Sequence, residues 1–200
     1  EGEVLFDHQK IFGPSPRRGV VFQDAVLFPW LTVLGNVTFG LRHNGYNKNA
    51  ARQVALECLQ RVGMEQHAKA WPVTLSGGMR QRVAIARILA LQPQALLMDE
   101  PFSALDANSR EHLQDTLVSL WQKERHTILY ITHSVEEAAY LADRVLIFGP
   151  APDNLHADIS VDLPRPRRRS SAQVQQLARQ LRQQLNQLPC CLTPLFRGKP

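Results

Sequence analysis

The chain has 200 residues, of which 44% are hydrophobic and 20% are charged. This composition is typical of one globular domain with a hydrophobic core, and it argues against a disordered chain. The formal net charge of +5 suggests nucleic-acid binding at first, but the charges balance over residues 1–150 and the excess lies in 151–200. We expect no nucleic-acid partner, because the basic run at 165–169 has no interleaved aromatic residues.

The sequence also bears on the compartment. No segment approaches the roughly 20 apolar residues that span a bilayer, and the opening EGEVLFDHQK does not resemble a signal peptide. Cys58, Cys190 and Cys191 have no metal-ligand spacing, which favours a reducing compartment. We therefore expect a cytoplasmic protein, with the basic run solvated or in contact with acidic lipid or a partner.

The first half of the chain contains two short extended segments, EVLF and GVVF, on either side of a Gly-Pro-rich turn. Apolar residues then recur at three- and four-residue steps over 49–62, which predicts a helix that Gly63 ends. A further helix is predicted directly after Ser76-Gly77-Gly78, ending before Pro93.

The second half alternates strands and helices. QALLMDE at 94–100 is predicted to be a strand buried on both faces of a parallel sheet. Asn108 is a candidate cap for the next helix. TILYIT at 127–132 and RVLIFG at 144–149 read as two more strands around a helix. This alternation predicts the α/β class, with helical crossovers between parallel strands.

Two adjacent carboxylates, Asp99 and Glu100, end the strand predicted at 94–100. One carboxylate can anchor a hydrated Mg²⁺, which prefers few protein ligands plus water and phosphate oxygens. The other can act as a general base for water. Taken alone, an Asp-Glu pair after a strand is more often a solvated turn.

The segment LSGGM at 75–79 places a hydroxyl and two glycine amides at a predicted helix N-terminus. Unpaired N–H groups and the helix dipole favour a phosphate at such a position. An ordinary turn or helix cap is the alternative interpretation.

Taken together, five segments resemble, in order and spacing, the ATP-binding subunits of ABC transporters: Gln23, LSGGM at 75–79, LLMDE at 96–100, SALD at 103–106 and His133. The resemblance extends to about residue 149. It implies an α/β fold like that of P-loop NTPases, with ATP and Mg²⁺ as ligands.

The resemblance also implies a role for each residue. Asp99 would bind Mg²⁺ and Gln23 would reach toward Mg²⁺ and water. Glu100 would be the catalytic base and His133 would hydrogen-bond the terminal phosphate. The signature residues Ser76, Gly77 and Gly78 would contact ATP held by a second ATPase subunit, with Asp106 in the adjoining D-loop.

A segment of the form G-x-x-x-x-G-K-[ST], whose backbone and lysine bind phosphates in cis, does not occur in the sequence. We expect an N-terminally incomplete ATPase domain over 1–150, with a helical subdomain at about 40–92, an exposed sheet edge, and poor ATP binding on its own surface. Residues 151–200 are expected to form a basic tail, rich in Pro, Arg and Gln, with one helix near 171–188.

Within that family, the segment from Gly13 to Leu41 looks most like importer subunits for nitrate, taurine and aliphatic sulfonates. This likeness implies a dimer on the inner face of the cell membrane, transmembrane permease subunits and a periplasmic binding protein. The segment Val26–Val37 is expected to meet the permease, with core packing as the alternative.

Other functions remain open from the sequence. An importer of a thiamine-precursor pyrimidine and a truncated, non-catalytic fragment both fit the same motifs. A chromosome-maintenance ATPase fits poorly, because the segment between Gln23 and Ser76 is short and has no heptads.

Overall fold

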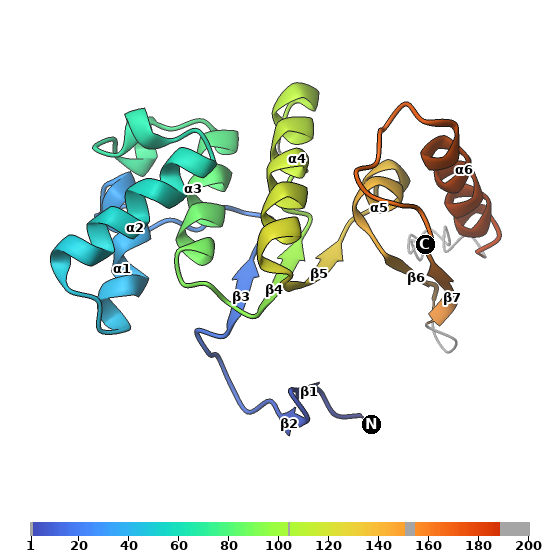
Figure 1. Cartoon of the computed structure of the whole chain (residues 1–200), viewed down its shortest axis with the longest axis horizontal. Helices are drawn as coiled ribbons and strands as arrows, with labels where there is room; N and C mark the ends of the chain where they lie inside the picture. Colours follow the sequence, from blue (N-terminus) through green and yellow to red (C-terminus); the bar gives the residue numbers. More distant parts are fainter. Residues whose placement is uncertain (1, 104, 151–154, 189–200) are drawn as a thin grey trace, which may run out of the picture. The chain divides into compact units, whose positions relative to one another are not determined.

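The computed structural model describes residues 2–103, 105–150 and 155–188 (Figure 1). Its contacts divide the chain into two compact units, and the boundary between them in the sequence lies between Ile131 and Thr132. The predicted boundary near residue 150 falls inside the second unit, because the strand after it pairs with the strand before it. Cys190 and Cys191 lie outside the described residues.

The elements of the first unit are β1 (Leu5–Phe6), β2 (Gln9–Lys10), β3 (Arg18–Val21), α1 (Val33–His43), α2 (Lys48–Arg61), η1 (Glu65–His67), η2 (Pro72–Thr74), α3 (Gly77–Leu89), β4 (Ala95–Asp99), α4 (Ala107–Glu124) and β5 (Thr127–Ile131). Strands β3, β4 and β5 form a parallel sheet with β4 in the centre, while β1 and β2 form a small antiparallel pair. The parallel sheet with helical connections confirms the α/β class.

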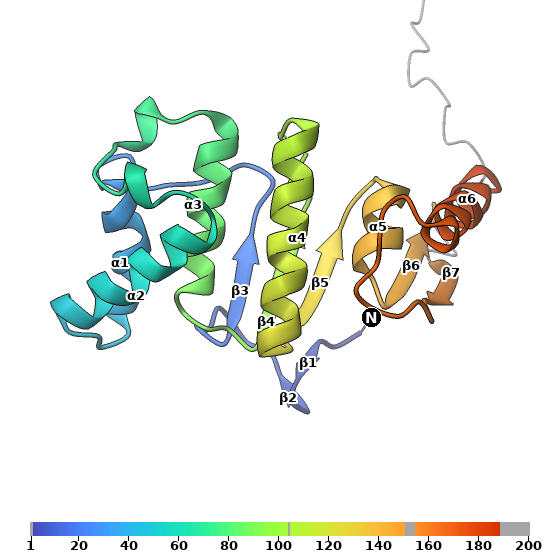
Figure 2. The same cartoon turned by 45° about the horizontal axis from the view of Figure 1, so that its top comes forward.

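The two faces of the parallel sheet differ in burial. On one face, Val20, Leu97 and Leu129 stand in one row and are 39%, 37% and 56% exposed. The alternate residues, such as Met98 at 1% exposure, belong to the main core with residues of α3 and α4. Figure 2 shows these two helices beside the parallel strands. The strands are therefore not buried on both faces as expected, because the described helices of this unit cover one face.

Helix α3 lies close against β3 because residue 19 is a glycine. A Cβ atom at Gly19 would overlap the Cγ2 atom of Ile88 and come within 3.1 Å of Leu96 Cδ2. The missing side chain lets the helix approach the strand, which places the N-terminus of α3 near the carboxyl end of the sheet.

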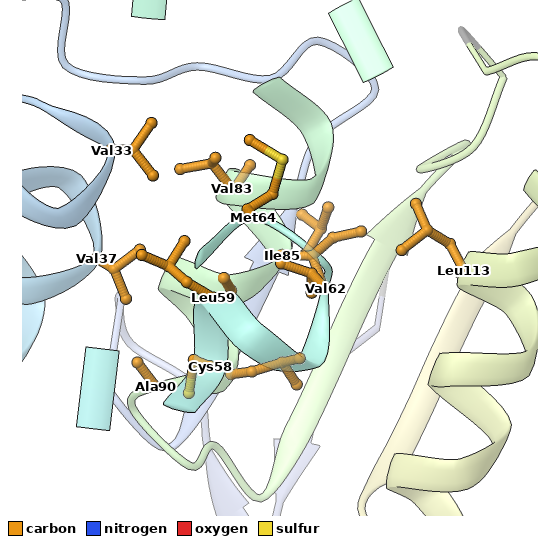
Figure 3. Packing of buried hydrophobic residues seen from close by; sticks show 14 of the residues in the cluster. Val33, Val37, Cys58, Leu59, Val62, Met64, Val83, Ile85, Ala90 and Leu113 are labelled. Atoms are coloured by element: carbon orange, nitrogen blue, oxygen red, sulfur yellow. The ribbon is translucent and has the colours of Figure 1, made fainter. Parts of the chain in front are cut away.

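Three helices, α1, α2 and α3, pack against one another through apolar side chains (Figure 3). Val37, Leu59 and Val83 are completely buried there. The helical part begins at Val33, earlier than the predicted residue 40, because Thr32 caps α1 by accepting a hydrogen bond from the Gly35 N–H group. Helix α2 confirms the predicted helix over 49–62.

The cap of α4 differs from the prediction. Asp106, not Asn108, is the N-cap residue, and its Oδ1 accepts a hydrogen bond from the Ser109 N–H group at 2.9 Å. Both residue types are good caps, so composition did not distinguish them. Leu113, Leu117 and Leu120 are buried in the core shared with the sheet.

The elements of the second unit are α5 (Val135–Leu141), β6 (Arg144–Phe148), β7 (Leu155–Ser160) and α6 (Ala172–Asn186). Strands β6 and β7 are antiparallel, and α5 packs against α6. Their core includes Ala139, Ile147 and Leu181. The helix predicted near 171–188 is confirmed as α6. No helix in the described ranges is long and apolar enough to cross a bilayer.

The basic run at 165–169 is partly structural rather than simply solvated. The Arg167 side chain is 2% exposed and donates hydrogen bonds to the carbonyl oxygens of Tyr140 and Ala142, at 3.2 and 2.6 Å. Arg165 donates to Leu141 O and pairs with Asp143. These arginines satisfy carbonyl groups at the C-terminus of α5, which helical geometry leaves unpaired.

Candidate functional site

A cavity of about 410 Å³ opens at the N-terminus of α3. Its lining includes four residues singled out from the sequence, namely Ser76, Gly77, Gly78 and Asp106. The first three belong to the turn that starts α3, and Asp106 belongs to the turn that starts α4. The free amides at the start of α3 favour an anionic ligand, whereas the carboxylate of Asp106 already caps the start of α4.

Ser76 is the N-cap residue of α3. Its Oγ atom accepts a hydrogen bond from the Met79 N–H group at 3.2 Å, which fixes the side chain at the helix end. The hydroxyl proton is still available as a donor. A phosphate oxygen in the cavity could accept it.

The two glycines that follow differ in their surroundings. A Cβ atom at Gly77 would meet nothing closer than Arg80 Nη2, at 3.9 Å, whereas a Cβ atom at Gly78 would lie 2.7 Å from Leu105 Cδ2. Gly78 is therefore required for the close packing of α3 against the segment before α4. The first amides of a helix have no partner within the helix, so those of Gly77 and Gly78 are suited to bind a phosphate.

Asp106 lines the cavity, and its pKa is shifted by its hydrogen bonds. The Ser109 backbone N–H and hydroxyl groups donate to its carboxylate, and this lowers the pKa of Asp106 below its ordinary value. The side chain is therefore ionised at neutral pH and is committed to capping α4.

Asp99 and Glu100 lie at the carboxyl end of β4, the central strand, and they are not among the residues that line the cavity. Glu100 has a φ of 40°, in the left-handed region that glutamate adopts at a cost of roughly 1–3 kcal/mol. Three hydrogen bonds hold it there: its N–H group donates to Ile131 O, and its carbonyl oxygen accepts from the Ser103 N–H group and from Ser103 Oγ. Strain of this kind is common at functional sites.

Gln23 lies two residues after the end of β3, at the same edge of the sheet as the carboxylates. Val21 is the last residue of β3 and pairs with Met98, one residue before Asp99. Because parallel strands end at the same edge, Gln23 lies beyond the end of β3 at the edge where Asp99 ends β4 and Glu100 follows it. Gln23 and Asp99 are both exposed.

His133 lies in the second unit, directly before α5, and its side chain is exposed. The backbone around it is fixed by a network at the helix start. Thr132 Oγ1 donates to the buried Glu137 carboxylate at 2.8 Å and accepts from the Ser134 N–H group at 3.0 Å. Ser134 in turn caps α5.

No three His, Cys, Asp or Glu side chains among the described residues gather into a metal-binding group. A site with one carboxylate, such as that of Asp99, together with phosphate oxygens would have a chemistry that suits Mg²⁺.

Sequence reasoning missed several residues that line the cavity, among them His67 and Arg82. Arg82 is four residues after Gly78 on α3, so helical periodicity places both on one face, and this signal could have identified it. His67 ends the short helix η1, and nothing in its local pattern points to the cavity.

An aromatic patch follows Gln23 in the chain, formed by Phe28, Trp30 and Phe39. Phe28 lies 5.5 Å from Trp30 and 4.7 Å from Phe39 between ring centroids. Trp30 is 68% exposed and Phe39 is 50% exposed. The guanidinium of Arg87 lies 5.4 Å from the centre of the Phe28 ring, and burial lowers the pKa of Arg87.

The expected contact segment Val26–Val37 is thus divided between two roles. Its buried residues Leu27, Val33 and Val37 pack in the core, as the alternative interpretation holds, while Val26 and Trp30 remain exposed. The exposed part of the segment therefore includes Trp30 of the aromatic patch.

The family model described as ABC transporter matches residues 1–103. An uncharacterized ABC transporter ATP-binding protein of Methanocaldococcus jannaschii is 51% identical over 171 residues, which cover 86% of this chain and 64% of that protein. The chain therefore spans about two thirds or less of the length of several curated relatives that it matches.

Several relatives have names that state a substrate. The taurine import ATP-binding protein of Rhizobium johnstonii is 46% identical, with 82% of this chain and 63% of that protein covered. The aliphatic sulfonates import ATP-binding protein of Bacillus cereus is 40% identical, with 92% and 72% covered.

The fold is also found among solved structures. One is the dimeric post-hydrolysis structure of an ATP-binding cassette bound to ADP and Pi, which is 30% identical. It matches 82% of this chain and 75% of that chain with a TM-score of 0.71. The chain belongs to the ABC transporter family, within the group of its ATP-binding subunits that includes import proteins.

Proposed function

We propose that this chain is the ATP-binding subunit of an importer that couples ATP hydrolysis to the uptake of a small anion, such as a sulfonate, taurine or nitrate. The observation that carries the ATP-binding part of the proposal is the cavity lined by Ser76, Gly77, Gly78 and Asp106. It offers a hydroxyl and helix N-terminal amides to one anionic ligand.

In this proposal the cavity receives the terminal phosphate of ATP held by a second ATPase subunit. The Ser76 hydroxyl donates to a phosphate oxygen while its lone pair keeps the hydrogen bond from Met79. The amides of Gly77 and Gly78 stabilise the charge. Nucleotide contact then requires two subunits, so hydrolysis depends on dimer formation.

The chemistry is assigned to the residues at the carboxyl edge of the sheet. Asp99 and Gln23 would hold Mg²⁺, which neutralises phosphate charge when bound. Glu100 accepts the proton of the attacking water, and its held backbone keeps the carboxylate in place. His133 donates a hydrogen bond to the terminal phosphate from the start of α5.

The aromatic patch is the proposed contact for a transmembrane permease subunit. Exposed aromatic residues with apolar neighbours are typical anchors of protein interfaces. A periplasmic binding protein would supply the anion on the opposite side of the membrane, with this chain on the cytoplasmic face. Trp30→Ala should weaken binding of the chain to permease vesicles at least tenfold, whereas Trp71→Ala, another exposed tryptophan, should not.

A second candidate is a non-catalytic chain that binds no ATP in cis. The observation in its favour is that the sequence has no G-x-x-x-x-G-K-[ST] segment. We expect negligible ATP affinity for the 200-residue chain alone. Micromolar binding by calorimetry to monomeric chain would contradict this expectation.

The deciding test begins with the coding DNA upstream of Glu1, where an in-frame phosphate-binding segment would support the enzyme. In the protein as its gene encodes it, Glu100→Gln should lower ATP turnover by roughly 10²–10⁴-fold while ATP binding persists. Glu57→Gln, an exposed glutamate on α2, is the matched control and should leave turnover unchanged. Unchanged turnover in the Glu100 variant would reject the base assignment.

Uptake measurements address the solute. A strain lacking the gene should lose uptake of labelled taurine, alkanesulfonate or nitrate, and the gene should restore it. Loss of pyrimidine-precursor uptake alone would instead support the thiamine-related importer.

A further inference from the structure

Gln81 is a buried glutamine on α3, with 2% of its surface exposed. Its Nε2 group donates a hydrogen bond to the backbone carbonyl of Phe22 at 3.1 Å. Phe22 directly precedes Gln23, and α3 begins with Gly77 and Gly78. One side chain therefore joins the helix of the cavity to the loop of Gln23.

The other end of the same amide is not satisfied. Gln81 Oε1 is buried and has no hydrogen-bond partner among the described residues. An unpaired buried acceptor costs about 1–3 kcal/mol, which offsets the roughly 1 kcal/mol gained from the bond to Phe22. A methionine would fill a similar volume without this cost. Stability alone therefore does not account for a glutamine here, whereas fixing the position of Phe22 does.

The loop between β3 and α1 is attached at both of its ends. At the far end, the Val33 N–H group donates to Ala70 O at 2.9 Å and the Leu34 N–H group donates to Ala68 O at 2.9 Å. Residues 68–70 lead directly into the segment before Ser76. At the near end the strand pairing stops at Val21, so the bond from Gln81 extends the attachment past the sheet.

The middle of this loop is itself held together. Asn36 is completely buried, and its side chain accepts from the Phe28 N–H group at 2.7 Å. It also donates to the carbonyl oxygens of Phe28, Leu31 and Thr32 at 3.1 Å each. The loop that carries Trp30 is therefore held in one conformation by these hydrogen bonds. A displacement of Trp30 would be passed on to the residues that are hydrogen-bonded to the two ends of the loop.

We propose that Gln81 is a positioning residue that fixes Gln23 relative to Ser76, Gly77 and Gly78. This inference rests on the proposed function for the meaning of that position, but not for the physical link. Through Gln81, movement of the loop displaces α3, so Gln23 and the cavity residues change place together. Gln81 itself does not touch the nucleotide.

The link can be tested on the chain itself by measuring the distance between residue 23 and a reference position on α4. Nitroxide labels on Gln23→Cys and Gln122→Cys, in a background with the three native cysteines replaced, give a distance distribution by pulsed electron resonance. Gln81→Met should at least double the width of this distribution without lowering the thermal midpoint by more than a few degrees. Gln114→Met is the matched control, because Gln114 is a glutamine on α4 that is 4% exposed. It should leave the width unchanged.

If Gln81→Met fails to fold, a second variant and a measurement on the unmodified chain still test the link. Gln81→Asn keeps an amide that is one methylene too short to reach Phe22, and it should broaden the distribution as the methionine does. In the unmodified chain, the Gln81 side-chain amide protons should exchange with water at least tenfold more slowly than those of exposed glutamines. Exchange at the exposed rate, or an unchanged width in both folded variants, would overturn the link.

The kinetic consequence separates this inference from the proposed function. Where the encoded protein hydrolyses ATP, Gln81→Met should lower kcat about fivefold, as expected for one lost hydrogen bond, with KM for ATP unchanged. An equal fall for Gln114→Met, or a rise in KM without a change in kcat, would contradict a positioning role. Absence of any ATP turnover would refute the proposed function and leave the distance result standing.

Discussion

The contact between Gly78 and Leu105 supports a prediction about the start of α3. Gly77 and Gly78 are neighbours in the same first helical turn, and they differ chiefly in the space that a methyl group would meet. A Cβ atom would lie 2.7 Å from Leu105 Cδ2 at position 78, and it would enter open space at position 77. Gly78→Ala should therefore destabilise the first unit relative to Gly77→Ala.

The expected difference follows from two opposing effects. Replacing glycine by alanine within a helix gains up to about 1 kcal/mol at either position, so this gain cancels in the comparison. Overpacking at a close contact costs about 1–3 kcal/mol, and the Leu105 side chain is 6% exposed and has little room to turn away. Gly78→Ala should therefore unfold about 1–3 kcal/mol more easily than Gly77→Ala.

Tryptophan fluorescence is the appropriate assay, because Trp30, Trp71 and Trp121 are the three tryptophans of the chain and all lie in the first unit. Urea unfolding of both variants gives the two free energies of unfolding. Combining Gly78→Ala with Leu105→Ala should recover at least 1 kcal/mol of coupling energy in a double-mutant cycle. Equal free energies for the two single variants, or no coupling, would refute the packing argument.

Three more predictions concern other parts of the chain. Arg167→Ala should destabilise the second unit by about 2–4 kcal/mol, because it leaves buried carbonyls of α5 unpaired. Arg168→Ala is the control and should change the free energy of unfolding by no more than about 0.5 kcal/mol. Hydrogen exchange of the α5 amides measures both changes. The folded pKa of Asp106 is lowered, so its contribution to stability is present above about pH 4 and is lost as the pH falls through the folded pKa. Urea titrations should show this loss in the wild type but not in Asp106→Asn, and parallel pH curves would contradict it. Leu129→Thr, on the exposed face of the sheet, should change stability by less than about 1 kcal/mol and reduce binding of an apolar dye, whereas Leu96→Thr should cost about 2–4 kcal/mol.

Local patterns predicted the elements well where periodicity and punctuation agree. The helix at 49–62 and the strand after Pro93 match α2 and β4, because apolar spacing and breakers are both properties of adjacent residues. The cap of α4 was misplaced because Asp106 and Asn108 have similar capping propensity, and the choice depends on which side chain reaches Ser109.

Contacts between distant residues were harder to foresee. The segment LSGGM predicted an anion site at a helix start, and the structure brings Ser76 and Asp106 to the same cavity. The contributions of His67 and Gln81 depend on partners far along the chain, so no local pattern revealed them. Likewise, a composition rich in arginine after Pro164 gave no sign that Arg167 turns inward.

The inward arginines change what the positive charge of this chain can do at a membrane. Each basic side chain close to an anionic bilayer contributes about 1 kcal/mol of attraction, so four freely exposed arginines between 165 and 169 would contribute about 4 kcal/mol. In the fold, Arg165 and Arg167 are 13% and 2% exposed, Arg169 stacks on Tyr140, and Arg168 is left facing water. The attraction available from this run is then nearer to about 1 kcal/mol, too little to hold the chain on a lipid surface without a protein receptor there.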